Sequence, residues 1–370
     1  MPSRSTTICL AAAAIAGAIA APGVAAEPTL VAPSVEAIPA RPLIARSRLG
    51  RELNLDLVVK NTTGRPLELV TVRAAVFDPS GAVTRRLEVN DNGIAPGIET
   101  LPNRRVGPGE ARTVFNPFHT FAADVPLDRV DFELVFRDAE GRDVVSRLSV
   151  RPVEYRTKTR LRLPLDGRML VWDGHDYLSH HRRFDLAHPV VQGLGWTGNS
   201  GRYSFDLVLT DQAGRMTRGE GKADADYLGA GQPVLAPAAG TVVRVMNDAA
   251  RSKDGLDLKA VKASSLVIFG NYVVIDHGNG EFSQLGHLQQ GSVTVRVGDK
   301  VAAGQPVARV GATGSSLFPH LHYQLVSAPD AASEGLPVEF EDFTDVLGAK
   351  TAHVARGTID TGDIVERGGR

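Results

Sequence analysis

The sequence predicts an all-β protein with two domains. Its 370 residues are enough for about two ordinary domains. Short runs of alternating apolar and polar residues recur along the chain, which is the period of a half-buried strand. The 38 glycines and 22 prolines punctuate these runs, and helical periodicity is almost absent. Together these observations predict short strands joined by tight turns.

The first 26 residues have the order of a secretory signal peptide. Arg4 precedes an apolar run over residues 8–21, and the small residues Val24, Ala25 and Ala26 follow. This order predicts export and cleavage after Ala26, and the run is too short for a comfortable membrane span. We therefore expect a periplasmic or secreted protein. The single cysteine, Cys9, lies within this segment, so the mature chain would contain no disulfide.

Residues 27–48 contain four prolines and little periodicity, which predicts a linker. Residues 49–155 then alternate apolar and polar positions, beginning with Leu53, Leu55, Leu57 and Val59. Further strand-like runs follow at 67–78, 113–115, 131–137 and 144–150, with turn residues between them. Short strands with this punctuation predict an immunoglobulin-like β-sandwich. Because His119 is its only histidine, we interpret this domain as a packing or recognition module.

Residues 161–345 predict a second compact all-β domain, with residues 346–370 as a C-terminal tail. Glycine and proline separate β-branched runs at 231–237, 240–243, 297–301 and 304–311. Residues 247–264 are polar and predict an exposed loop between two strands. Nine of the ten histidines lie after residue 174. Any chemistry carried by histidine therefore belongs to this second domain.

One strand in this domain presents two histidines on one face. Residues 321–326 alternate and are rich in β-forming residues, and His320 and His322 are two positions apart. Side chains two apart on a strand point to the same side, so the two imidazoles project together. Such a pair can ligate a metal, or place one ligand beside one proton donor.

Several motifs in order extend this pair into a family resemblance. They are the GQPVLAP block at 231–237, the GTVV block at 240–243, the stretch 270–280, His287-Leu288, the turn at 297–301 and Pro319-His320-Leu321-His322. Over about residues 175–340 the chain resembles the lysostaphin/LytM-type zinc metallopeptidases, which cut peptide cross-links in bacterial cell walls. The resemblance implies that His322 ligates zinc, and that His287 and His320 assist the chemistry.

The resemblance also requires an upstream histidine and aspartate as zinc ligands. His181 and Asp185 have the compact spacing of the commonest members, whereas residues 199–206 resemble the aspartate segment of a subgroup with separated ligands. Asp206 alternates with the apolar residues Phe205 and Leu207, which places it on a strand. We therefore predict His181 and Asp206 as the ligands, with Asp185 as a competing carboxylate and His180 as a competing imidazole.

Two imidazoles and one carboxylate leave a fourth position open, which is the pattern of a catalytic zinc site with one ion per chain. The chain has no HExxH glutamate to serve as a base, so the two remaining imidazoles must handle protons. We expect His320 to take the proton from water. We expect His287 to stabilise the oxyanion or protonate the leaving amine, and the sequence leaves the division between the two rings open.

The resemblance implies an envelope endopeptidase that hydrolyses peptidoglycan cross-links. The alternative within the same resemblance is a catalytically inactive activator of another cell-wall hydrolase. The net charge of −1 favours neither nucleic acid nor an anionic membrane as a partner. The sandwich domain would position the enzyme on the wall or on an envelope protein, or cover the groove. The sequence leaves open which cross-link bond is cut and what oligomer forms.

Overall fold

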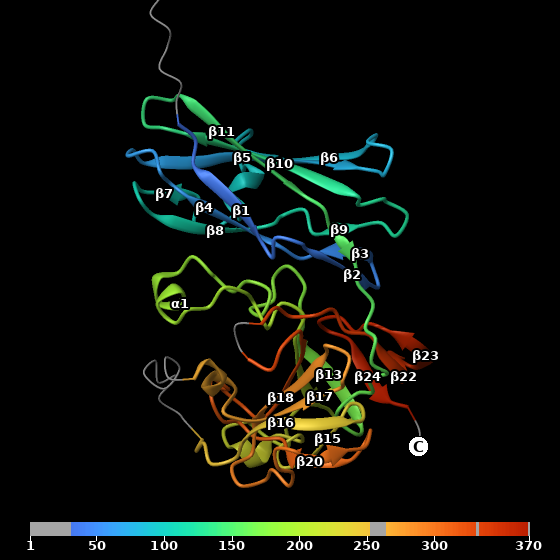
Figure 1. Cartoon of the computed structure of the whole chain (residues 1–370). Helices are drawn as coiled ribbons and strands as arrows, with labels where there is room; N and C mark the ends of the chain where they lie inside the picture. The colour runs from blue at the N-terminus through green and yellow to red at the C-terminus, as the bar shows by residue number, and fades with distance from the viewer. Residues whose placement is uncertain (1–30, 252–263, 331–332, 369–370) are drawn as a thin grey trace, which may run out of the picture. The chain divides into compact units, whose positions relative to one another are not determined.

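Alternating apolar side chains build the N-terminal domain from antiparallel sheets. The computed structural model describes residues 31–251, 264–330 and 333–368. One sheet has the order β1-β4-β8, and a second has the order β11-β10-β5-β6 with β7 paired to β5. Figure 1 draws these two sheets as two layers. Their strands are β1 (Ser34–Ile38), β4 (Asp56–Lys60), β5 (Leu67–Phe77), β6 (Val83–Asn90), β7 (Arg105–Val106), β8 (Ala111–Phe115), β10 (Arg129–Arg137) and β11 (Asp143–Val150).

The strand-like runs of the sequence correspond to strands of these sheets. Along β10, Val130, Phe132, Leu134 and Phe136 are buried, as a period of two requires. The all-β prediction is therefore confirmed for this domain, while its immunoglobulin-like character stays a prediction. Strand β6 was not predicted, because its side chains are mostly exposed or half-buried and give no apolar alternation.

The structure corrects the predicted linker at residues 27–48. From Ser34 this segment forms β1 and β2 (Leu43–Ser47). Strand β2 belongs to a sheet of order β12-β2-β3-β9, with β3 (Gly50–Leu53), β9 (Thr120–Phe121) and β12 (Val153–Glu154). Ile44 and Ala45 are buried in it. Strands of five residues next to prolines are too short to show a period.

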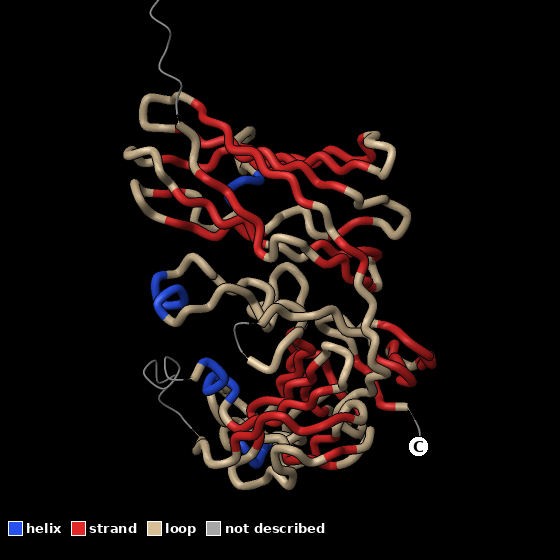
Figure 2. The backbone as a smooth tube through the Cα atoms, viewed as in Figure 1, coloured by secondary structure: helices blue, strands red, loops and turns tan. Residues whose placement is uncertain are grey.

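The C-terminal domain is built on one long sheet. Its order is β19-β16-β17-β18-β21-β14-β13-β24-β22-β23, and a separate pair is formed by β15 and β20. Figure 2 shows how strands dominate over helices throughout the described chain. The bounds are β13 (Arg168–Asp173), β14 (Phe205–Leu209), β15 (Pro233–Leu235), β16 (Gly240–Met246), β17 (Asn271–Asp276), β18 (Phe282–Leu288), β19 (Lys300–Val301), β20 (Pro306–Arg309), β21 (Leu321–Val326), β22 (Phe340–Leu347), β23 (Lys350–Gly357) and β24 (Ile364–Arg367).

Residues 346–370 are not the tail that the sequence predicted. Strands β22, β23 and β24 extend the sheet beyond β13, and Val365 of β24 is buried in the core. Strand β23 is largely exposed, so its residues lack the apolar pattern that signals a strand. The pairing of β24 with β13 joins residues far apart in the chain.

The neighbouring strands β14 and β21 position two of the predicted site residues. Asp206 lies directly opposite His322 in their antiparallel register. Phe205 and Leu207 pack into the core, as do Leu321 and Tyr323. Because side chains alternate along a strand, Asp206 and His322 share the other face of the sheet.

The segment 174–204 connects β13 to β14 with little regular structure. It contains one short helix, α1 (Pro189–Gly193), and otherwise turns and bends. Short 3₁₀ segments also occur at Gly97–Thr100, Asp224–Asp226 and Ser265–Phe269. Because 174–204 forms no strand, its shape depends on side-chain contacts with neighbouring elements.

Residues 32–370 form one compact unit. Within the described residues, no helix is long and apolar enough to cross a membrane. The predicted signal peptide, and most of the loop predicted at 247–264, lie outside the residues that the structure describes.

Candidate metal centre

Three imidazole rings converge on one carboxylate oxygen. The distances from Asp206 Oδ1 are 3.4 Å to His181 Nε2, 3.3 Å to His320 Nε2 and 3.1 Å to His322 Nδ1. All four side chains are buried. The structure thus brings together the three predicted ligands and one of the two predicted catalytic histidines.

The outward nitrogen of each ring is bound to a hydrogen-bond acceptor. His181 Nδ1 lies 3.2 Å from the carbonyl of Gly174, and His320 Nδ1 lies 2.9 Å from the carbonyl of Phe318. His322 Nε2 lies 2.9 Å from the side-chain oxygen of Gln324. Each of these three oxygens can only accept a hydrogen bond, so the ring nitrogen beside it must carry the hydrogen. In each neutral ring the other nitrogen, which faces Asp206, therefore carries a lone pair.

Three lone pairs directed at an anionic oxygen form a site for a cation. Tetrahedral zinc holds nitrogen and oxygen ligands at about 2.0–2.2 Å, so its ligand atoms lie about 3.3–3.5 Å from one another. The separations of His181 and His322 from Asp206, 3.4 and 3.1 Å, are close to this value. These three residues therefore fit one zinc ion. His320 supplies a further nitrogen at a similar distance from the carboxylate.

The electrostatics of the site favour an ionised carboxylate. Burial alone would raise the pKa of the Asp206 carboxyl, but the imidazoles of His181 and His320 hold it well below its usual range. Burial would lower the pKa of His320, but the charge of Asp206 raises it above the ordinary value. Burial dominates for His322 and lowers its pKa. The centre therefore presents one anion among rings of different basicity.

His287 stands beside this centre, and its ring is hydrogen-bonded to Thr313 rather than to Asp206. Its Nδ1 donates to the carbonyl of Thr313 at 2.8 Å, which leaves Nε2 for the cavity. Its ring centroid lies 4.8 Å from that of His320. Burial and the neighbouring imidazoles hold the pKa of His287 well below its usual range, so the ring is neutral. Its backbone has a positive φ of 60°, which is uncommon outside glycine and occurs at functional sites.

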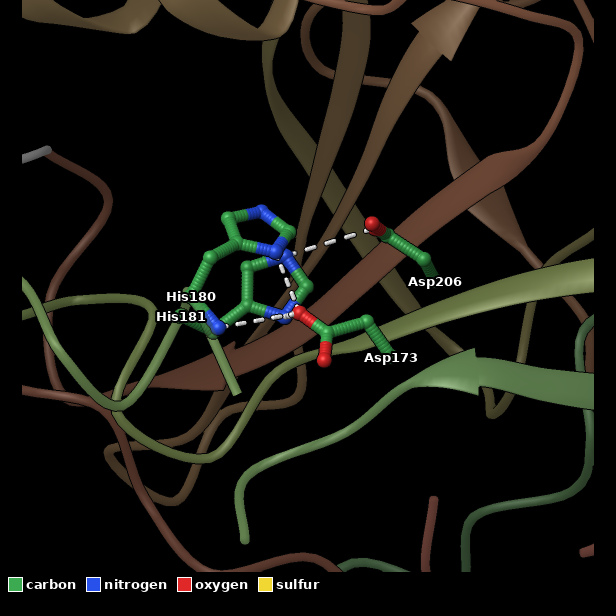
Figure 3. Close-up of side chains that lie close together, drawn as sticks. All are labelled: Asp173, His180, His181 and Asp206. Atoms are coloured by element: carbon green, nitrogen blue, oxygen red, sulfur yellow. Dashed lines mark hydrogen bonds and ion pairs between the residues drawn. The ribbon is translucent and has the colours of Figure 1, made fainter. Parts of the chain in front are cut away.

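Asp173 is a site residue that sequence reasoning missed. It ends β13 opposite Asp206, next to a register shift in the pairing. One carboxylate oxygen of Asp173 contacts His180 and lies 3.4 Å from His181 Nδ1 (Figure 3). The ligand atoms of Asp173, His180, His181 and Asp206 lie within 4.8 Å of one another, so Asp173 borders the centre on the side of His181. The sequence around Asp173 shows only a polar residue after an apolar run. Its role depends on the pairing with Asp206, which is distant in the chain.

The two competing residues lie differently. Asp185 accepts a hydrogen bond from the backbone of Ala187 at 3.0 Å and does not line the cavity. It therefore shapes the turn before α1. His180 has a 70% exposed side chain and pairs with Asp173, whereas His181 is buried and reaches Asp206. The geometry favours His181 and Asp206.

The centre opens into a cavity of about 660 Å³ with mainly apolar walls. Trp172 and Phe318 lie on it, with Leu317, whose exposure is 86%. The walls are completed by residues of the 174–204 segment and the loop before β17, including Phe184, Val190, Val191, Leu194, Trp196, Ile268 and Phe269. The predicted site residues His181, Asp206, His287, His320 and His322 all line this cavity.

Comparison with known proteins identifies part of the C-terminal domain. Residues 225–334 match the model described as Peptidase family M23. Over 57 residues the chain is 46% identical to the Peptidoglycan DD-endopeptidase ShyA of Vibrio cholerae, covering 15% of this chain and 13% of that protein. Over 80 residues it is 34% identical to the Murein hydrolase activator EnvC of Escherichia coli, covering 20% and 19%. The chain thus matches less than a fifth of the length of either relative.

A search of solved structures finds the catalytic domain of the antimicrobial peptidase lysostaphin from Staphylococcus simulans. It is 24% identical, and the match covers 38% of this chain and 80% of that chain with a TM-score of 0.23. The matched family range includes His287, His320 and His322, and it begins after His181 and Asp206.

Proposed function

We propose that this chain, whose residues 225–334 form a Peptidase family M23 domain, is a zinc-dependent endopeptidase that hydrolyses peptide cross-links of peptidoglycan in the bacterial envelope. The supporting observation is the convergence of three imidazole nitrogens on Asp206 Oδ1 at 3.1–3.4 Å. The name of the Vibrio relative supports the substrate. The predicted signal peptide supports export to the periplasm or beyond.

We assign the metal to His181, Asp206 and His322. Zinc bound there would supply a Lewis acid that polarises a peptide carbonyl and makes a nearby water more acidic. Gly174 and Gln324 fix which nitrogen of His181 and His322 would be available to the ion. Such outer contacts orient ligands and tune their basicity.

Proton transfer falls to His320 and His287. Each ring is held at Nδ1 by a backbone carbonyl, of Phe318 and Thr313 respectively, and so offers Nε2 to a reacting group. We retain the expectation that His320 accepts the proton of the attacking water at Nε2. In the free protein the neutral ring of His287 carries its proton at Nδ1, so its Nε2 must first take up a proton before it can stabilise the oxyanion or protonate the leaving amine.

The second candidate function is an inactive activator of another wall hydrolase. The observation that favours it is the likeness to the Escherichia coli activator, which extends over more residues than the likeness to the endopeptidase. The complete set of ligands and catalytic imidazoles favours the enzyme. A metal-binding chain that releases no fragments from the wall would support the activator.

The first experiment is the zinc content of the purified chain, together with release of soluble fragments from purified peptidoglycan. Asp206→Ala is compared with Asp185→Ala as the matched control, because Asp185 lies outside the cavity. We expect one zinc per wild-type chain, loss of zinc and activity in Asp206→Ala, and retention of both in Asp185→Ala. Two substrates are tested in parallel: sacculi with direct D-alanyl cross-links and walls with glycine bridges. The one that releases fragments identifies which cross-link bond is cut. The opposite pattern in the two variants would refute the ligand assignment.

A further inference from the structure

A carboxylate of the N-terminal domain is buried against the segment that carries the metal ligands. Asp56 lies on β4, and its two oxygens accept from two different arginines of the segment 174–204. Arg182 Nη1 lies 2.6 Å from Asp56 Oδ1, and Arg202 Nη1 lies 2.7 Å from Asp56 Oδ2. Arg182 Nη2 also donates to the carbonyl of Leu55 at 2.7 Å.

These contacts are fully desolvated. The side chains of Asp56, Arg182 and Arg202 are all 0% exposed, and Arg202 also pairs with Glu334. A buried charge without its partner is strongly unfavourable, because solvent cannot replace the lost interaction. Any arrangement of the segment that moves Arg182 away from Asp56 therefore carries a high cost in free energy. The pairing fixes where these arginines can lie.

Both arginines lie close in sequence to proposed metal ligands. Arg182 follows His181 directly, and Arg202 lies shortly before Asp206. Because 174–204 forms no strand, its backbone near His181 has little regular hydrogen bonding to hold it. The main chain of His181 is held by Asn199, which donates to its carbonyl at 2.8 Å. The next residue, Arg182, is held by its ion pair with Asp56.

Other contacts support the same face of the segment. Glu52 of β3 lies 3.3 Å from the buried His175, and Thr113 of β8 accepts from the backbone of Ala187 at 3.1 Å. His119 stacks on Tyr177 at 4.7 Å. The cavity, in contrast, is lined only by residues from 172–324 within the described chain. The N-terminal domain therefore contacts the back of the ligand-bearing segment without lining the cavity.

We propose that Asp56 is a positioning residue for the metal centre, acting through Arg182 and Arg202 to hold His181 and Asp206 in register. The inference rests on the proposed function, because it assigns the N-terminal domain a part in building that same site. The domain then supports the active conformation, in place of the covering role that domain order alone allowed. Moving this domain away from the segment 174–204 would weaken metal binding at the centre.

The test compares Asp56→Asn and Asp56→Glu with Arg48→Ala in the full chain. Asparagine keeps the shape and removes the charge, while glutamate restores the charge. Arg48 is the matched control, since it joins the same two regions through Asp345 and Asp363, outside the segment 174–204. Zinc affinity is measured by chelator competition, and cobalt absorption reports the ligand geometry. Hydrogen exchange of the backbone over 174–188 is followed in the metal-free protein.

We expect Asp56→Asn to weaken zinc binding by on the order of 10–100-fold, to change the cobalt spectrum and to speed exchange over 174–188. Asp56→Glu should recover part of each, and Arg48→Ala should change none. If Asp56→Asn does not fold, Arg182→Met removes the same anchor and leaves Asp56 paired with Arg202. Folded variants with wild-type affinity and exchange would overturn the inference. A wild-type chain that binds no zinc would refute the proposed function. Hydrogen exchange over 174–188 would still show whether Asp56 holds this segment in place.

Discussion

Replacing Gln324 by leucine tests how the second layer of the centre acts on its ligand. Gln324 is fully buried on β21, and its side-chain oxygen accepts from His322 Nε2 at 2.9 Å. Its amide nitrogen donates to Gln284 at 3.1 Å, which fixes the orientation of the amide. Leucine has a similar volume and no acceptor. His322 would lose the contact that keeps its Nδ1 unprotonated and directed at Asp206.

The expected loss of zinc affinity follows from the N–H of His322 that is left without an acceptor. A buried donor without a partner costs about 1–3 kcal/mol, and loss of an outer-layer partner weakens metal binding by about 10–100-fold. That factor corresponds to about 1.4–2.7 kcal/mol of binding free energy. The ring can escape the penalty only by moving its proton to Nδ1, which removes the lone pair that faces the metal site.

The assay is chelator competition for zinc, with thermal unfolding of the metal-free chain as the measure of stability. Gln284→Leu is the matched control, because it removes the support of Gln324 and leaves the contact of Gln324 with His322 in place. We expect affinity to fall in the order wild type, Gln284→Leu, Gln324→Leu. Equal affinity in Gln324→Leu and wild type, with folding intact, would refute the view that this amide sets the protonation of His322.

Three further predictions concern separate parts of the domain. His287→Ala should lower kcat by about 10²–10⁴-fold with unchanged zinc content, because its contact is to Thr313 and not to Asp206. Gly270→Ala should destabilise the fold by about 1–3 kcal/mol or more, measured by denaturant unfolding, since φ is +61° and a Cβ would lie 2.3 Å from Thr313 Oγ1. Burial would raise the pKa of Glu281, but hydrogen bonds from residues 155–159 lower it below the ordinary 4.5; its contribution to stability is therefore present above pH 4.5 and lost as pH falls below. The unfolding free energy of Glu281→Gln should lie below wild type at pH 7 by about 1–3 kcal/mol, and the gap should close in acid.

The sequence predicted those features that depend on local alternation. Residues 321–326 were predicted as a strand and form β21, with Leu321 and Tyr323 in the core and His322 on the opposite face. The same reasoning placed Asp206 on β14. A period of two is a property of neighbouring residues, so it can be read without knowing which strands pair. The choice of Asp206 over Asp185 depended on this alternation.

What the sequence could not supply depends on pairing between distant strands. Asp173 joins the site because β13 pairs with β14 and places it opposite Asp206. Gln324 is polar and fully buried, a combination that becomes informative only when its partner Gln284 on β18 is known. Asp56 contacts Arg182 across 126 positions of the chain. None of these residues belongs to a motif with a fixed spacing.

The energetics of the centre bear on the choice between enzyme and activator. Buried imidazoles around a carboxylate lose their solvation. The three lone pairs directed at Asp206 make a favourable interaction that offsets this loss only when a proton or a cation lies between them and the carboxylate. A bound metal would stabilise the fold by about 4 kcal/mol at a thousand times its Kd. Metal binding alone would therefore serve an activator as well as an enzyme. His287 is different, because its positive φ and its buried, neutral ring add cost while its hydrogen bond goes to Thr313 and not to Asp206. A scaffold that only binds metal has no need of such a residue, whereas an enzyme needs a second imidazole at the cavity wall.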